Sequence, residues 1–196
     1  MATSWEFLGG ALCLDFLNTV HCYGAEDPRD DLRSPEDLLS WAVAAGVVSR
    51  QESTEVQRDF QEHPTAGERL LRDAKHIRDQ LREIFKSRRV KPKPTDVELL
   101  NSLLGEHSAV PAIANKAGDL AVHWCPTASP GIVLPILLSA AELVTGGQWA
   151  RVRECGSATC TFLFLDTSKN HSRRWCDMRV CGNRAKVAGF RLRHGR

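Results

Sequence analysis

The sequence predicts an α+β protein, in which a mainly helical N-terminal body with a small β-hairpin precedes a small treble-clef-like zinc module with four cysteines. Three observations support this prediction. Apolar residues recur at helical spacing along much of the chain up to residue 147. Two runs of strand length flank a short polar segment within the body. Two cysteine pairs with the same internal spacing lie near the C-terminus. We place the boundary at Gly146-Gly147, with the body at 1–147 and the module at 148–196.

The first apolar stretch, Trp5–Val20, contains a small polar cluster. On a helix, Asp15, Asn18 and Thr19 lie within one turn of each other, so their polar groups are able to converge on a pocket. His21 is close enough to join them. We therefore predict that these four residues line a site for a small-molecule effector. The alternative is that Asp15 and Asn18 bond to nearby backbone groups and that His21 is structural.

Helix signals are clear in the next part of the body. Ser34 is a capping residue, Pro35 suits the first helical position, and Gly46 can adopt the left-handed conformation that stops a helix. Residues 49–64 are compatible with a short helix or a loop. Residues 66–89 have the longest clear amphipathic pattern, and we predict a helix there whose charged face is a solvated surface.

A second helix of the body is predicted after a proline-containing stop. Thr95 and Glu98 have the spacing of a capping box, and this helix is expected to run through Leu104 and to stop at Gly105. It would pack as a pair with the helix before it.

The body ends with a hairpin and a final helix. Residues 109–114 and 120–124 have strand-like length and are separated by a polar turn, which predicts a hairpin packed against the helices. Residues 126–130 are predicted to form a loop. Pro135 is a suitable start for a last helix, which would end at Gly146.

The cysteine spacing indicates a metal site. Cys155 and Cys160 have four residues between them, fifteen residues follow, and Cys176 and Cys181 repeat the first spacing. Two such pairs supply the tetrahedral sulfur set that zinc prefers, with bonds of roughly 2.3 Å. Four protein ligands leave no open coordination position, so we predict one zinc ion with a structural role.

Between and after the cysteine pairs, the chain has short structural signals and many basic residues. Residues 161–165 suit a short strand, residues 166–170 a turn, and the segment after Cys181 a helix. Gly182 would allow a tight turn at the metal, and Trp175 would shield the thiolates from water.

The predicted nucleic-acid contacts are residues able to bind phosphates or base edges. Arginine and asparagine pair bidentately with guanine and adenine, whereas lysine mostly supplies charge. For Arg173 and Arg174 there is an alternative, since a zinc ion with four thiolates has a formal charge of −2 that arginines can offset by donating to sulfur. The predicted DNA-binding set is Arg173, Arg174, Asn183, Arg184, Lys186, Arg191 and Arg193.

The module also resembles a known family. The segments Asp166–Asn170, Ser172–Cys176 and Cys181–Lys186 are similar to the signature of the CGNR zinc finger, a bacterial module held to bind DNA. In that family it usually follows a region called the ABATE domain, and Leu14–Val20 and Leu38–Ala42 resemble the opening of that region. The resemblance implies a stress-induced transcriptional regulator.

The charge is divided unequally along the chain. Residues 151–196 contain eleven Lys and Arg against three acidic residues, a net charge of +8; positions 1–150 retain 15 basic and 21 acidic residues, a net charge of −6. A basic module on an acidic body indicates a polyanionic partner for the module, and solvated surface charge is the alternative.

Composition narrows the cellular context. The sequence has no signal peptide pattern and no apolar run near the ~20 residues of a membrane span, so we expect a cytoplasmic protein without a membrane partner. Four of the seven cysteines belong to the zinc pattern, and Cys13, Cys22 and Cys125 are scattered, as expected in a reducing compartment.

The favoured function is therefore a regulator that binds double-stranded DNA, in which the body is a sensor or forms a homodimer. An RNA-binding zinc protein is the first alternative, and it would need exposed aromatic residues for base stacking. For this role the sequence offers Phe162, Phe164, Trp175 and Phe190, and three of them are expected to be core. The second alternative is an enzyme with a structural zinc module, but no catalytic constellation is evident in positions 1–150. A redox-sensing variant, in which oxidised thiolates release zinc, also stays open.

Overall fold

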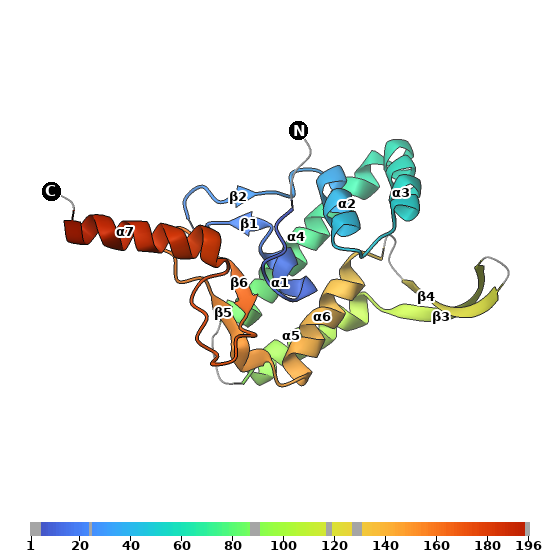
Figure 1. The fold of residues 1–196 in the computed structure, drawn as a ribbon. Helices are drawn as coiled ribbons and strands as arrows, with labels where there is room; N and C mark the ends of the chain where they lie inside the picture. The colour runs from blue at the N-terminus through green and yellow to red at the C-terminus, as the bar shows by residue number, and fades with distance from the viewer. Residues whose placement is uncertain (1–4, 24, 87–90, 117–118, 127–130, 195–196) are drawn as a thin grey trace.

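A computed structural model describes residues 5–23, 25–86, 91–116, 119–126 and 131–194 of the chain (Figure 1). Helices dominate the body, and short strands pair locally. The α-helices are α1 Leu12–Leu17, α2 Pro35–Ala44, α3 Arg50–Glu62, α4 Pro64–Lys86, α5 Pro94–Glu106, α6 Val133–Thr145 and α7 Asn183–His194. A 3-10 turn, η1 Trp149–Arg151, follows α6, and a π-helical turn, η2 Met178–Gly182, precedes α7.

The strands of the described residues form three two-stranded antiparallel sheets. Each sheet joins strands that are close in sequence, so none requires a long crossover. The pairs are β1 Val20–His21 with β2 Arg29–Asp30, β3 Ala109–Lys116 with β4 Asp119–Pro126, and β5 Val152–Glu154 with β6 Leu163–Leu165. The predicted fold class, a mainly helical α+β body with a small four-cysteine module, is confirmed.

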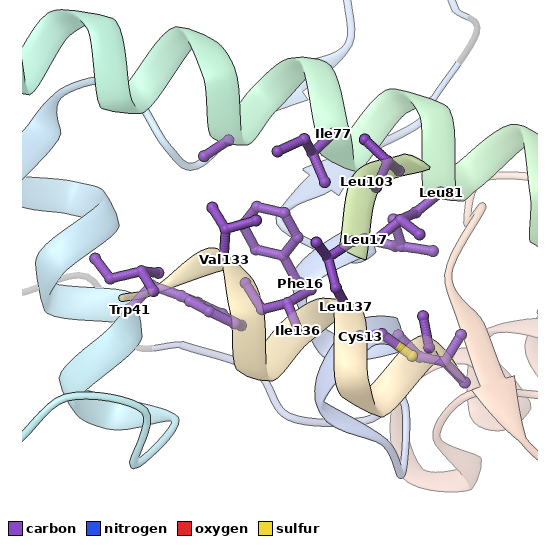
Figure 2. Packing of buried hydrophobic residues seen from close by; sticks show 14 of the residues in the cluster. Cys13, Phe16, Leu17, Trp41, Ile77, Leu81, Leu103, Val133, Ile136 and Leu137 are labelled. Carbon is purple, nitrogen blue, oxygen red and sulfur yellow. The ribbon is translucent and has the colours of Figure 1, made fainter. Parts of the chain in front are cut away.

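The core is organised around α1, a short helix whose residues 13–17 are all buried. It contacts α4, α6 and β6. Phe16 lies with its ring centroid 5.0 Å from that of Trp41 on α2. Leu17 of α1 and Ile136 of α6 belong to the same buried cluster (Figure 2). An apolar hexapeptide thus holds the larger helices together, because nearly every one of its side chains is removed from water.

Several predicted helix signals are confirmed. The Ser34 hydroxyl accepts a hydrogen bond from the backbone N–H of Asp37 at 3.3 Å, and Gly46 has a φ of 73° just after α2. The segment left open between helix and loop is helix α3, because Ser49 and Glu52 form a capping box at its start. The long amphipathic helix is α4, which ends at Lys86; the last residues of the predicted helix, 87–89, lie outside the described chain.

The predicted start and end of α5 are wrong. The residue that caps its first turn is Asp96, whose carboxylate accepts the backbone N–H of Lys93 at 2.9 Å, so Thr95 and Glu98 are not the box. Gly105 does not stop the helix, which continues to Glu106. Its φ is not positive, and an added Cβ there would meet nothing within 4 Å, so the helix passes through it without conflict.

The predicted hairpin is present, but it does not lie against the helices. β3 and β4 pair from Ala109 opposite Pro126 to Lys116 opposite Asp119, and the hairpin extends away from the body (Figure 1). Val110 and Ile113 on β3 are 53% and 78% exposed. The predicted packing of this hairpin on the helices is therefore wrong, and the predicted loop at 126–130 lies almost wholly outside the described residues.

The zinc module is joined to the body through its β5–β6 hairpin. Leu163 and Leu165 of β6 belong to the main core together with α1 and α6. The backbone N–H of Leu165 donates to the Gly9 carbonyl at 2.7 Å. The Asn18 amide donates to the Leu163 carbonyl and accepts from its N–H, both at 2.8 Å. Part of the module is therefore built into the core of the body.

Candidate metal centre and the basic helix

The four predicted ligands come together in one cluster. The sulfur atoms of Cys155, Cys160, Cys176 and Cys181 all lie within 4.8 Å of one another. The Cys160–Cys176 and Cys176–Cys181 sulfur distances are both 3.7 Å. A tetrahedron with zinc–sulfur bonds of about 2.3 Å has edges of about 3.8 Å, so these thiols fit one zinc ion. The four cysteines form a closed structural site with no fifth protein donor among the described residues.

Local hydrogen bonds place each pair of sulfurs. The Cys155 N–H donates to the Phe162 carbonyl at 2.8 Å, which closes the first knuckle over β6. In the second knuckle the Asp177 carboxylate accepts from the N–H groups of Arg179 and Val180 at 2.6 and 3.0 Å. An added Cβ at Gly182 would lie 2.4 Å from the sulfur of Met178, but the Met178 side chain is half-exposed and able to move aside, so this contact alone does not require glycine after Cys181.

The electrostatics of the thiols favour a metal ion. A hydrogen bond from Cys176 lowers the pKa of Cys160 to about 5. Burial, with the charge of Cys160 beside it, raises the pKa of Cys181 to about 11. A negative charge on Cys160 therefore opposes ionisation of its neighbour Cys181. A divalent zinc ion compensates the negative charge and allows all four sulfurs to lose their protons.

The predicted turn after β6 is held together by the carboxylate of Asp166. Asp166 is fully buried, and its carboxylate accepts from the Ser168 N–H at 3.0 Å and from the Arg173 N–H at 3.0 Å. Burial opposes its charge, but hydrogen bonds from Ser168 and Arg173 hold the pKa of Asp166 below its ordinary value. This carboxylate ties the end of β6 to the segment that enters the second knuckle.

The predicted basic residues divide into two groups. Arg173 is partly buried; its Nε donates to the Trp175 carbonyl at 2.9 Å, its Nη2 donates to the Cys176 carbonyl, and its guanidinium lies over the Phe164 ring. The alternative role of Arg173, donation to sulfur, is therefore replaced among the described contacts by donation to carbonyl groups of the second knuckle. Arg174 is exposed, and its guanidinium carbon lies 5.1 Å from the Trp175 ring centroid.

The other predicted contacts lie on α7, which projects from the module (Figure 1). The Asn183 amide donates to the Arg179 carbonyl at 2.8 Å, so it stabilises the turn into the helix. Arg184 is exposed and donates to the Thr159 hydroxyl at 3.2 Å. Lys186 and Arg191 are exposed, whereas the side chain of Arg193 lies outside the described ones. Their role in DNA binding stays a prediction.

The predicted effector residues mostly bond to the chain itself. Asp15 accepts the Gly9 N–H at 2.7 Å, Asn18 bonds to Leu163, and the Thr19 hydroxyl donates to the Phe16 carbonyl at 2.7 Å. The alternative of backbone bonding therefore describes Asp15 and Asn18. The His21 Nε2 lies 2.6 Å from the Asp31 carboxylate, and His21 also lines a cavity beside the zinc cluster.

The sequence analysis did not identify Arg78 and Arg82 as residues that support the site, because their charges suggest an exposed surface. The charged face of α4 is not wholly solvated, since Arg78 and Arg82 are each 3% exposed. Arg78 binds Asp30 in a bidentate manner at 2.9 and 2.8 Å. Arg82 donates to the carbonyl groups of Leu17 and Thr161, which links the body to the first knuckle. Their partners are far away in sequence, so no local pattern indicates them.

With this geometry in view, comparison with known families is decisive. Residues 10–147 match the family model ABATE, described as "Putative stress-induced transcription regulator". The chain belongs to the ABATE family. Residues 151–194 match the CGNR zinc finger, which agrees with the ligand cluster and the expected family. No curated protein shows a significant match to the chain.

These findings describe a zinc-binding protein of a regulatory family. Both family descriptions concern regulation or a zinc finger, and neither names a catalytic activity. Within the described part of the ABATE protein, every helix is too short or too polar to cross a membrane.

Proposed function

We propose that this ABATE protein is a zinc-dependent transcriptional regulator that binds double-stranded DNA through its C-terminal module. The observation that carries the proposal is α7, a helix that projects from the zinc knuckle with Arg184, Lys186 and Arg191 exposed along it. A basic helix of 12 residues is long enough to lie in a DNA major groove. The regulatory description of the family and the net charge of the module support the same function.

The contacts divide the predicted residues by role. Arg184 and Arg191 are able to reach base edges or phosphates, and Lys186 supplies charge. Arg174, which is exposed just before the second knuckle, is assigned a phosphate contact in this proposal. Arg173 and Asn183 keep the knuckle and the helix start in shape, because their donors already bond to backbone carbonyls.

The test is selection of sequences from random duplex DNA by the zinc-loaded protein. Cys181→Ser protein is treated in parallel at the same salt concentration. Enrichment of one motif by the intact protein alone would support a sequence-specific regulator. Equal enrichment by the zinc-deficient variant, or no binding by either protein at low salt, would exclude the proposal.

RNA binding is the second candidate, and one observation favours it. Phe190 on α7 is 58% exposed, whereas Phe162 and Phe164 are buried. An exposed aromatic ring beside arginines is the surface on which single-stranded bases stack. Competition between duplex DNA and a single-stranded RNA pool separates the two functions, because DNA recognition predicts that the duplex competes better.

The body is proposed to sense a small molecule or to form a homodimer. Among the predicted effector residues, His21 lines a cavity that has a volume of about 350 Å³ and lies against the zinc cluster. Asp15 and Asn18 would act indirectly, because Asn18 bonds to Leu163 of β6 and Asp15 bonds to Gly9, whose carbonyl accepts the Leu165 N–H. Thr19 would act through its bond to Arg78. Sedimentation of the purified protein with and without DNA distinguishes a dimer from a monomeric sensor.

A further inference from the structure

One cysteine outside the zinc set is held against the first knuckle. Cys22, in the turn after β1, donates its thiol to the Thr159 carbonyl with a sulfur–oxygen distance of 3.5 Å. The next residue, Tyr23, donates its N–H to the Thr161 hydroxyl at 2.9 Å. These contacts fall on the two neighbours of Cys160. The body therefore fixes the Cys22 sulfur beside the backbone of a zinc ligand.

The same two cysteines share a cavity. Cys22 and Cys160 both line a cavity of about 350 Å³, and Cys176 and Cys181 of the second knuckle line it too. Cys160 is half-buried, whereas Cys155, Cys176 and Cys181 are 6%, 2% and 4% exposed. Cys160 is thus the zinc ligand most open to a small solute. The cavity brings it together with a thiol that the zinc ion does not need.

Tyr23 keeps this arrangement in place from the body side. The Arg82 guanidinium carbon lies 4.4 Å from the centroid of the Tyr23 ring, and Arg82 also donates to the Thr161 carbonyl. Because α4 holds both the turn after β1 and the first knuckle, Cys22 stays near Cys160 even when the zinc ion leaves.

We propose that Cys160 is an oxidation site and that Cys22 is its resolving cysteine, so that a hydroperoxide converts the pair into a Cys22–Cys160 disulfide and releases zinc. Thiolates at exposed positions beside a second thiol are the cysteines that oxidants modify reversibly. This modification concerns the metal centre itself and does not depend on which nucleic acid the module binds.

The reaction balances in two steps. The Cys160 thiolate attacks one oxygen of the hydroperoxide; a sulfur–oxygen bond forms, the oxygen–oxygen bond breaks, and the leaving oxygen takes a proton to give an alcohol or water. The Cys22 sulfur then attacks the sulfenic acid of Cys160. A sulfur–sulfur bond forms, the sulfur–oxygen bond breaks, and the departing hydroxide with the Cys22 proton gives water. Two sulfurs lose two electrons, which reduce the hydroperoxide.

Cys22 has an advantage over the remaining ligands as the second thiol. After oxidation of Cys160, the other three ligands would remain buried around the zinc ion, since Cys155, Cys176 and Cys181 are 6%, 2% and 4% exposed, whereas Cys22 is not a ligand of the zinc cluster. Within the described part of the chain, the Cys22 thiol has one hydrogen bond, to the Thr159 carbonyl. That bond is weak because its donor is a thiol, so it does little to prevent the Cys22 sulfur from reacting.

The experiment treats the zinc-loaded full chain with one equivalent of hydrogen peroxide. Zinc release is followed with a chromophoric chelator, and disulfides are mapped by mass spectrometry of alkylated peptides. We expect zinc release together with a Cys22–Cys160 disulfide, and recovery of zinc binding after dithiothreitol and zinc are added. In Cys22→Ser protein we expect loss of that disulfide and loss of recovery, because the oxidised Cys160 proceeds to higher acids.

Controls separate this modification from general damage. The Cys22→Ser hydroxyl is still able to donate to Thr159, so the variant should fold and bind zinc before oxidation. Cys125→Ser, on β4, removes a thiol outside the module and should behave as the unmodified protein. A first disulfide among the four ligands, or full recovery by the Cys22→Ser protein, would overturn the proposal.

Discussion

The two halves of the zinc module have opposite relations to the body. β6 is buried along its whole length and bonds to Gly9 and Asn18 of the body. α7 exposes most of its described side chains, and its main described contacts are with the adjacent turn η2 (Figure 1). One half is therefore part of the core, and the other half presents a surface.

The cysteines connect these halves. Cys155 and Cys160 lie in the first knuckle, between β5 and β6, and Cys176 and Cys181 lie in the second knuckle, before α7. A zinc ion on these four sulfurs joins the buried strand to the projecting helix. The comparison shows why a structural metal is placed here: α7 has few apolar contacts of its own, so its position depends on the second knuckle.

Loss of zinc should have the largest effect on the contrast between buried β6 and exposed α7. We expect Cys181→Ser to abolish zinc binding and to release α7, while the body keeps its helices. Structural zinc sites contribute about 10–16 kcal/mol of binding free energy in zinc-finger peptides, far more than α7 obtains from its own contacts. Metal analysis and limited trypsin digestion would measure this. Equal protection of residues 183–194 in both proteins would contradict it.

Removal of a core side chain from β6 should destabilise the whole protein. Leu163 is 2% exposed among core residues of the body, so Leu163→Ala should lower the free energy of unfolding by about 2–5 kcal/mol. Val187 on α7 is 50% exposed, and Val187→Ala should change the free energy of unfolding by about 0.5 kcal/mol or less. Urea denaturation followed by far-UV circular dichroism compares the two. Similar losses in both variants would show that β6 is not part of the core.

The arginines offer a sharper version of the same comparison. If Arg184 binds a phosphate, as one form of the proposed function has it, Arg184→Gln should weaken DNA binding and reduce the slope of log affinity against log salt by about one unit. Arg173→Gln should lower the stability of the module, since its donors bond to the second knuckle. Binding titrations at several salt concentrations and thermal melts distinguish them. An unchanged salt slope in the Arg184 variant would remove this residue from the interface.

Much of the fold was predictable because its signals are local. The cap at Ser34, the stop at Gly46 and the spacing of the four cysteines each depend on residues only a few positions apart. Capping of α5 was mistaken because two carboxylates, Asp96 and Glu98, compete for one helix start, and the choice between them depends on where the backbone turns.

Long-range features of the site were not predictable from one sequence. Arg78 is paired with Asp30 at 48 positions' separation, and Asn18 bonds to Leu163 at 145 positions' separation. A polar residue in an apolar segment indicates that some partner exists, but it does not indicate which one. The predicted pocket at Asp15, Asn18, Thr19 and His21 is a case of this, because the same residue types suit ligand binding and backbone bonding equally.

The smallest expected effect concerns the carboxylate that supports the β6 anchor. The Asp15 carboxylate accepts the Gly9 N–H, and the Gly9 carbonyl accepts the Leu165 N–H, so Asp15 holds the loop to which β6 is bonded. Burial raises the pKa of Asp15 from 3.8 to about 6, although the hydrogen bond from Gly9 favours its charge. Because the folded protein holds this proton more tightly than the unfolded chain, the contribution of Asp15 to stability increases as pH falls from 7 to 5.

Asp15→Asn keeps an acceptor for Gly9 and removes the titration. Relative to this variant, the unmodified protein should gain about 1 kcal/mol of unfolding free energy between pH 7 and pH 5. The difference between the two proteins is the quantity to measure, because acid also protonates the zinc thiolates in both of them. Urea denaturation at the two pH values provides it. A difference that is the same at both pH values would mean that Asp15 ionises as freely in the folded chain as in the unfolded one, and that its bond to Gly9 outweighs its burial.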